Sequence, residues 1–372
     1  MSRDMFLTSS ILAPMQRRQL APSKSWVGVD IGRSALKLAE VEQVDGFWKI
    51  IQMQYAPICQ SGVWSSRHLA GSVLANELSQ LVALTPGWKH RQAAAILSLS
   101  AADYRIMNLP NSSVDEYEEM IYQELVTEYQ EDVIFEYWEP EEELSDTNDE
   151  ITSLMVYSVA HSNANAVGTG LERAKLNCRV LDGLPFALSR AIVMADPAAR
   201  HRSTIALDWG YSSVVLLFLK DGIPFYTRLL RGCQFQVFLE MLGKEFDLDE
   251  RQSWNLLRST LAHQESSGEF RSALNKRLKP IVEDYLKMVS KEVTRTIQYI
   301  EANTRIARSE HVWAFGGGAL FRQLTEPLAE TLQIPVRPWE LRLAEKLDSP
   351  LHRDLVPLFG PAAALASLKR WQ

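Results

Sequence analysis

Two short stretches of the sequence place an aspartate and a glycine after a run of aliphatic residues. Residues 27–36 read VGVDIGRSAL and residues 205–214 read IALDWGYSSV, each with a serine two places after the glycine. A carboxylate at the end of a buried strand can hold Mg²⁺ or its waters, while the uncovered N–H groups of the turn donate hydrogen bonds to a phosphate. Two such turns, one on each of two lobes, would close on one polyphosphate from opposite sides.

The ordinary interpretation of either motif alone is a β-turn. Asp30 and Asp208 would then cap the turns, and Gly32 and Gly210 would supply a positive φ. Because the motif occurs twice, each time ahead of a matching set of strands, we favour phosphate binding. Lys37 would then reach a phosphate as a point charge, although alone it fits a solvated residue of a half-exposed strand equally well.

Three consecutive glycines, Gly316, Gly317 and Gly318, lie between an expected strand and an expected helix. Bare backbone there lets a flat ring or a phosphate approach, and the helix N-terminus favours an anion. A tight strand-to-helix turn needs about one glycine, so three favour a ligand. The chain has no GxxxxGK[ST] loop, and its seven histidines form no HExxH motif, which leaves P-loop chemistry and zinc hydrolysis without a starting point.

Composition sets the broad class. At 372 residues with 46% hydrophobic side chains, the chain is expected to form two domains or lobes. Its net charge of −7 argues against bulk attraction to nucleic acid or anionic lipid. Cys59, Cys178 and Cys233 are odd in number and widely separated, as in a reduced cytosolic protein. The longest strongly apolar stretch, Val214–Leu219, is far shorter than a spanning helix, and residues 1–24 are expected to be a disordered leader.

Each half of the chain opens with the same order of expected elements: strand, Asp-x-Gly turn, strand, Asp-Gly turn, strand. Asp45-Gly46 is the hairpin turn of the first half and Asp221-Gly222 that of the second. We therefore predict an internal duplication. Between the halves, Ser113 and Glu116 have the spacing of a capping box and predict a helix from Val114, while the acidic residues 141–150 predict a solvated loop between two strands.

The paired turns and the glycine loop resemble the actin, Hsp70 and sugar-kinase ATPase fold. Within that fold, the chain resembles the PilM family of type IV pilus assembly proteins, which are relatives of the division protein FtsA. The segments that carry the likeness span nearly everything after the leader: VGVDIGRSALKLAEVE, MNLPNSSVDEYEEMIYQEL, VLDGLPFALSRA, LDWGYSSVVLLFLKDGIPFYTRLLRG, WAFGGGALFRQLTEPLAETLQIPV and GPAAALASL.

The resemblance implies an α/β fold of two actin-like lobes, a duplicated ribonuclease-H-like fold with an FtsA-type inserted subdomain. The implied division is: first lobe 25–107 plus 181–203, inserted subdomain 108–180, and second lobe 204–372, of which about 241–310 is helical.

The resemblance also implies an ATP and Mg²⁺ site. Carried over by motif, the first phosphate loop comprises Asp30, Gly32, Ser34 and Lys37, the second comprises Asp208, Gly210, Ser212 and Ser213, and the adenosine side comprises Gly316, Gly317 and Gly318. Asp30 and Asp208 would be the metal ligands. The chain departs from the family pattern at three positions. In the second loop Val214 replaces a threonine, and in the helix on the adenosine side Asn255 and Arg258 replace a glutamate and a lysine, so ATPase activity is expected to be weak or absent.

The implied partner is the cytoplasmic N-terminal segment of a PilN-like bitopic membrane protein within a PilN–PilO complex. That segment would lie between the inserted subdomain and the first lobe, which would place the protein at the cytoplasmic face of the inner membrane, with self-association as a further possibility. The alternatives are a nucleotide-free adaptor and an FtsA-like filament protein, for which the C-terminal LASLKRWQ is a poor membrane anchor. A sugar kinase would need an additional carboxylate base, for which no motif is present.

Overall fold

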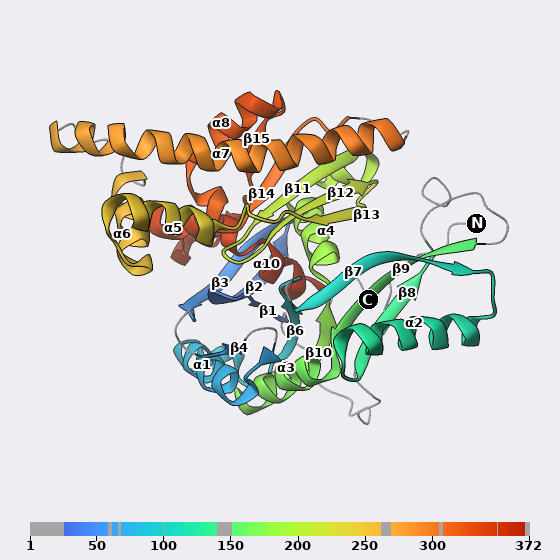
Figure 1. Ribbon diagram of the computed structural model, residues 1–372. Coiled ribbons are helices and arrows are strands. Elements are labelled where there is room, and N and C mark those ends of the chain that lie inside the picture. Colours follow the sequence, from blue (N-terminus) through green and yellow to red (C-terminus); the bar gives the residue numbers. More distant parts are fainter. Residues whose placement is uncertain are drawn as a thin grey trace. The chain divides into compact units, whose positions relative to one another are not determined.

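The structure is a computed structural model that describes residues 26–58, 62–65, 68–99, 101–139, 151–261, 269–304, 308–347 and 349–368. The chain forms two units, and Figure 1 labels their elements. The first unit runs to Ala195 and also includes Leu341–Arg353 and the chain from Phe359, and the rest is the second unit. The leader 1–24, Cys59 and the acidic loop 141–150 lie outside the described residues.

A six-stranded sheet in the order β10-β6-β1-β2-β3-β16 is the centre of the first unit. β1 is antiparallel to β2 and parallel to β6, and all of its residues are buried, as expected for a central strand covered on both faces. The strands are β1 (Val27–Ile31), β2 (Ala35–Val44), β3 (Phe47–Pro57), β6 (Gln92–Leu97), β10 (Asn177–Asp182) and β16 (Arg342–Leu343).

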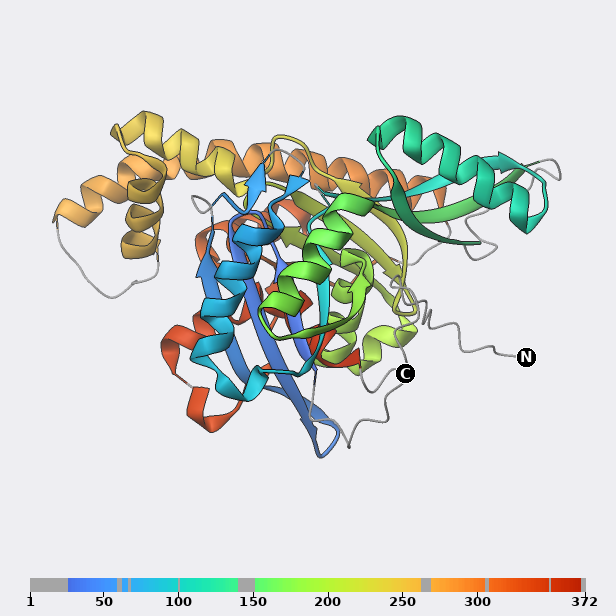
Figure 2. The same ribbon diagram turned by 90° about the horizontal axis from the view of Figure 1, so that it is seen from below.

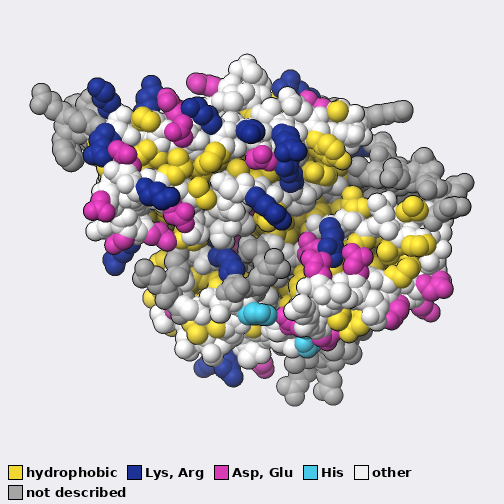
Figure 3. Space-filling model, in the orientation of Figure 1, with side chains coloured by type: hydrophobic (Ala, Val, Ile, Leu, Met, Phe, Trp, Pro, Cys, Tyr) yellow, Lys and Arg dark blue, Asp and Glu magenta, His cyan; other side chains and the backbone are white. Residues whose placement is uncertain are grey.

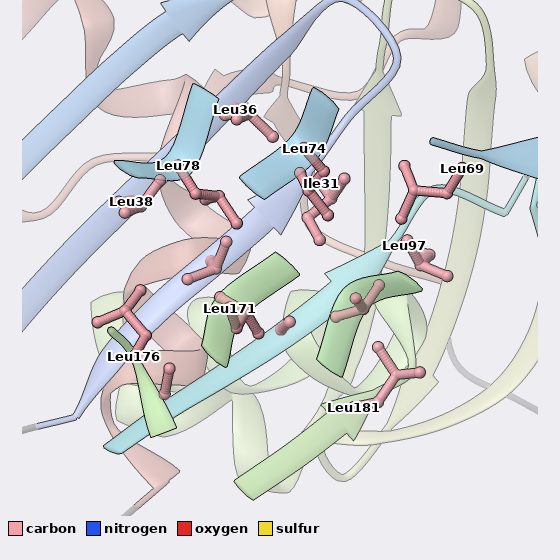
Figure 4. Close-up of a cluster of buried hydrophobic side chains, with 14 of the residues drawn as sticks. Ile31, Leu36, Leu38, Leu69, Leu74, Leu78, Leu97, Leu171, Leu176 and Leu181 are labelled. Atoms are coloured by element: carbon pink, nitrogen blue, oxygen red, sulfur yellow. The ribbon is translucent and has the colours of Figure 1, made fainter. Parts of the chain in front are cut away.

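Helices cover both faces of this sheet. Alternate residues of β1, namely Val27, Val29 and Ile31, join a buried cluster with α1 and α3 (Figure 4). α10 packs against β1, β2 and α4. These and the smaller elements are α1 (Gly71–Leu84), α3 (His161–Arg173), α4 (Leu184–Ala195), α9 (Pro350–Leu355), α10 (Gly360–Ala366), η1 (Pro86–Trp88), η5 (Glu345–Leu347), β4 (Trp64–Ser65) and β5 (His68–Leu69).

Gly28 explains why the last helix belongs to the first unit. A Cβ at Gly28 would lie 1.8 Å from the Ala362 carbonyl oxygen, so the backbone of α10 packs directly on β1. The second unit is therefore shorter than the expected 204–372. The sequence could not indicate this, because α10 follows the second unit along the chain and is small and apolar throughout.

The inserted subdomain is a three-stranded sheet in the order β7-β9-β8 with α2 on one face (Figure 2). Its elements are β7 (Ala102–Pro110), α2 (Val114–Tyr129), β8 (Val133–Trp138) and β9 (Ile151–Ala160). The predicted capping box is confirmed, because Glu116 accepts hydrogen bonds from the backbone N–H and the hydroxyl of Ser113. The insertion is about 102–160 instead of 108–180, since α3 packs on α1 and β10 joins the six-stranded sheet.

The second unit contains a five-stranded sheet in the order β13-β12-β11-β14-β15. Its strands are β11 (Ser203–Trp209), β12 (Val214–Lys220), β13 (Ile223–Leu229), β14 (Val312–Phe315) and β15 (Val336–Pro338). Its helices are α5 (Phe235–Phe246), α6 (Glu250–Leu261), α7 (Glu269–Asn303), α8 (Arg322–Leu332), η3 (Pro197–His201), η4 (Gly317–Leu320) and η6 (Val356–Leu358). Within the described ranges, none of the helices has the length and hydropathy to cross a bilayer.

The two sheets confirm the predicted duplication. The order β3-β2-β1-β6-β10 in the first unit matches β13-β12-β11-β14-β15 in the second, with the same parallel and antiparallel pairs. The two hairpin turns also match, because Asp45 and Asp221 both have φ of 52°, and the glycines that follow have φ of 82° and 79°. Such left-handed pairs form the type I′ turns that Asp-Gly favours.

The close approach of β1 and α10 is testable. We expect Gly28→Ala to destabilise the protein by about 3 kcal/mol, because the methyl group collides with helix backbone that cannot move aside without undocking. The control is Gly168→Ala in α3, where an added Cβ meets nothing within 4 Å. This control should stabilise the protein by up to about 1 kcal/mol by helix propensity. Denaturant unfolding measures both, and equal effects would contradict the packing argument.

Candidate functional site

The first Asp-x-Gly turn follows β1. Asp30 pairs with Lys37 in the β1–β2 register, and the Lys37 Nζ lies 2.5 Å from the Asp30 Oδ2. Both side chains are largely buried, at 9% and 15% exposed. Neighbours also hold the backbone of the turn: the Trp64 indole donates to the Gly32 carbonyl at 2.9 Å, and the Ile58 N–H donates to the Ser34 carbonyl at 2.7 Å.

Lys37 is therefore the ion-pair partner of Asp30, which the sequence did not predict. The predicted roles were separate, with a metal at Asp30 and a phosphate at Lys37, whereas the structure joins the two as an ion pair. The Lys37 ammonium also lies close to the turn, 3.4 Å from where a Cβ of Gly32 would stand. A cation thus already lies at the place where the turn would accept an anion.

The strands around the second turn have the same register as those around the first, but the side chains differ. Asp208 has Val215 as its cross-strand neighbour, at the position equivalent to Lys37. α5 begins against this turn, because the N–H groups of Phe235 and Gln236 donate to the carbonyls of Gly210 and Tyr211 at 3.1 and 3.0 Å. Of the other predicted residues here, Ser212 is half-buried, and Ser213 and Val214 are buried.

The glycines of the two turns are required by close packing. Neither Gly32 nor Gly210 has a positive φ, so the conformational reason given for them in the β-turn interpretation is wrong. A Cβ at Gly32 would stand 3.0 Å from the Ala35 carbonyl oxygen, and one at Gly210 would stand 2.6 Å from that of Ser213. In each turn the chain curls back on the glycine three residues later, which leaves no room for a side chain.

The glycine loop between β14 and α8 packs on Trp209, the middle residue of the second turn. A Cβ at Gly316, whose φ is 79°, would lie 2.7 Å from the Trp209 carbonyl oxygen, and one at Gly318 would lie 2.3 Å from the indole ring. Only at Gly317 is the space nearly open. The structure thus brings this loop and the second turn together. Contacts with Trp209 are sufficient to explain why Gly316 and Gly318 are glycines, without a ligand.

The helix expected to face an adenosine is α6. Asn255 is exposed on it, and the side chain of Arg258 lies outside the described ones. The two predicted metal ligands, Asp30 and Asp208, belong to different units. The described residues contain no group of three or more His, Cys, Asp or Glu that could hold a metal. A single carboxylate in either turn suits Mg²⁺ only if phosphate oxygens and water supply most of its ligands, which is the usual arrangement for this ion.

A second candidate site lies where the inserted subdomain meets the rest of the first unit. Tyr104 of β7, Trp138 of β8 and Phe186 of α4 form an aromatic cluster with ring centroids 5.3–5.9 Å apart. The hydroxyl of Tyr104 is buried and has no hydrogen-bond partner in the part of the chain that the structure describes. Burial raises the pKa of Tyr104, so the hydroxyl keeps its proton and remains a donor. Sequence reasoning missed this cluster, because its members are far apart along the chain.

The subdomain beside this cluster is strongly acidic. Residues 102–160 contain seventeen Asp and Glu and a single basic residue, Arg105, whereas the whole chain has 46 acidic and 39 basic residues. Exposed acidic side chains lie along the outer face of α2, and Figure 3 shows them on that part of the surface. The acidic surface attracts basic segments.

The family model for the type IV pilus assembly protein PilM matches residues 28–366. This chain belongs to the PilM family. No curated protein shows a significant match to its sequence. Among solved structures, one described as a PilM-PilN type IV pilus biogenesis complex is 23% identical, with a TM-score of 0.73 over 94% of this chain and 100% of that one.

A second solved structure is similar across the fold. The ethanolamine utilization protein EutJ from Carboxydothermus hydrogenoformans is 13% identical, with a TM-score of 0.52 over 93% of this chain and 90% of that one. At these identities the likeness shows a shared fold alone. Together with the duplicated sheets, it confirms the expected actin-like ATPase fold with an inserted subdomain.

The packing of the glycine loop gives a paired prediction. Gly318→Ala should destabilise this PilM-family protein by about 2 kcal/mol, because the added methyl meets the indole of Trp209. Gly317→Ala should change stability by no more than about 0.5 kcal/mol, because the nearest atom is 4.0 Å away. Thermal unfolding of the two variants distinguishes them, and equal losses would mean that the loop needs glycine for a reason other than Trp209.

Proposed function

We propose that this protein is a nucleotide-binding scaffold of a type IV pilus inner-membrane assembly complex. Its task is to hold the cytoplasmic N-terminal segment of a PilN-like bitopic membrane protein, and through it the PilN–PilO complex. Family membership and the fold shared with a solved PilM-PilN complex support this proposal. The protein would then be peripheral, held at the cytoplasmic face of the inner membrane by its partner.

The observation that carries the partner site is the hydroxyl of Tyr104, which has no hydrogen-bond partner among the described residues. A buried donor without an acceptor costs free energy, so an acceptor brought by a ligand recovers it. A peptide carbonyl is such an acceptor, and the half-buried rings of Trp138 and Phe186 supply apolar contact beside it. The acidic subdomain next to the cluster favours a segment that carries basic residues.

Nucleotide binding is proposed on the duplicated turns. Each unit contributes a glycine turn with an adjacent carboxylate, Asp30 or Asp208, and the first adds the cation of Lys37. Within either unit, a turn with a neighbouring carboxylate offers ligands of the kind that a phosphate and Mg²⁺ take. In the second unit, Gly317 also offers open backbone. We propose weak or absent hydrolysis, because Val214 and Asn255 lack the hydroxyl and the charge that the family pattern provides. Nucleotide would thus regulate the scaffold instead of driving a reaction.

Tyr104→Phe tests the partner site, because we expect it to weaken peptide binding without lowering the stability of the protein. Removing the unpaired hydroxyl should leave stability unchanged or raise it, yet weaken binding of a PilN-like N-terminal peptide about fivefold. The matched control is Tyr157→Phe, because the Tyr157 hydroxyl donates to the Asp182 carbonyl at 3.3 Å. It should lower stability and leave peptide affinity unchanged. Calorimetry and thermal unfolding measure both, and full peptide affinity in Tyr104→Phe would reject this site.

Calorimetry with Mg-ATP tests the nucleotide site. We expect the wild type to bind, and Lys37→Met to bind at least about tenfold more weakly, because a charge-assisted contact to phosphate is lost. Lys49→Met is the control, since Lys49 lies on the same sheet but pairs with the exposed Glu42 at 3.6 Å. If the folded wild type binds no Mg-ATP while the partner peptide still binds, the protein is a nucleotide-free adaptor.

A further inference from the structure

Trp209 connects the second turn to the long helix α7. Its indole N–H donates to the Tyr285 hydroxyl at 2.6 Å, and that hydroxyl donates to the Cys233 carbonyl at 2.7 Å. The Trp209 and Tyr285 rings stack at 6.0 Å, and Tyr285 stacks on Phe238 of α5 at 4.8 Å. These three aromatic side chains are fully buried. The turn is thus bonded to the middle of α7 by one continuous buried chain of contacts.

The indole is also enclosed on the side of the glycine loop. The backbone at Gly316 and Gly318 approaches Trp209 so closely that neither position has space for a Cβ. The ring therefore cannot change position without moving either the loop or Tyr285. Interiors packed this tightly transmit displacements instead of absorbing them.

Among the described residues of the first unit, the matching turn has no such connection. The equivalent residue of its turn is Ile31, an aliphatic residue in the hydrophobic cluster with α1 and α3. Ile31 has no side-chain donor, so it can couple to a helix only by packing. A tryptophan with its hydrogen bond is therefore a property of the second turn, and the fold alone does not require it.

We propose that Trp209 is a positioning residue that couples nucleotide at the second turn to the local stability of α7. The proposal rests on the proposed nucleotide binding. A phosphate accepted by the backbone of residues 208–213 shifts the turn, the enclosed indole moves with it, and the hydrogen bonds of Tyr285 change. Because both partners of the Tyr285 hydroxyl are buried, either loss changes the free energy of opening α7 around residue 285. Nucleotide bound at the second turn thus changes the local stability of α7, a helix that contributes no predicted ligand to the nucleotide.

Hydrogen exchange of the full chain tests the coupling, with every variant measured at saturating Mg-ATP so that changes in affinity cancel. In the wild type, exchange of the α7 amides around residue 285 should change about fivefold or more on adding Mg-ATP. The change should vanish in Trp209→Phe, which keeps a ring but no N–H, and in Tyr285→Phe. It should persist in Trp313→Phe, a control that removes a buried indole N–H with no hydrogen-bond partner among the described residues. A wild-type helix that ignores bound nucleotide, or a change that survives in Trp209→Phe, overturns the proposal.

Hydrogen exchange without nucleotide tests the coupling through Trp209 independently of the proposed nucleotide binding. Gly318→Ala pushes a methyl group into the indole, so exchange around residue 285 should rise about fivefold even without nucleotide. Trp209→Leu in the same chain makes room for the methyl and should remove the effect of Gly318→Ala. A general loss of stability in Gly318→Ala raises exchange throughout the second unit, so the response of α7 is judged against the other helices of that unit. If exchange around residue 285 rises no more than exchange in those helices, the coupling is wrong. If α7 responds but the wild type binds no Mg-ATP, the coupling exists and the nucleotide proposal fails.

Discussion

Close approach of backbone to backbone, or of backbone to a ring, is the constraint on which both units depend. α10 can cover the first sheet only because Gly28 has no side chain, and the second turn can close only because Gly210 has none. Gly316 and Gly318 let the loop after β14 lie on Trp209. At each place a single methyl group would separate two elements that are distant along the chain. The local backbone of the candidate phosphate turns follows from these contacts.

The duplicated frame holds two different sets of side chains. Both turns place an aspartate at the end of the first strand, but it faces Lys37 in one unit and Val215 in the other. The residue after the aspartate is Ile31 in the first turn and Trp209 in the second. The first turn is therefore the one with a cation at hand for phosphate, and the second is the one bonded to a long helix. The two units therefore share the order of their strands and differ in the side chains at the turn.

The inserted subdomain adds a second kind of surface. Its packing against the lobe is aromatic, its outer helix is acidic, and a buried tyrosine hydroxyl at the junction has no partner in the described structure. Buried groups of this kind are rare in folded proteins, because they cost free energy unless a ligand or water satisfies them. A protein-binding role for this junction and a nucleotide-binding role for the turns fit one molecule without competing for residues.

Local features of this protein could be predicted from the sequence. The Asp45-Gly46 and Asp221-Gly222 turns, the capping box of Ser113 and Glu116 and the duplicated strands each depend on residues close together in the chain, where type and spacing are sufficient. Only the tertiary structure showed that α10 joins the first unit, that Lys37 pairs with Asp30, that Trp209 explains two glycines, and that the Tyr104 hydroxyl is buried without a partner. The extent of the insertion also came from which sheet β10 joined. Most of these facts rest on contacts between segments far apart in sequence, and even the Asp30–Lys37 pair depends on strand register. No local pattern of residue types records which distant backbone or side chain fills the space beside a residue.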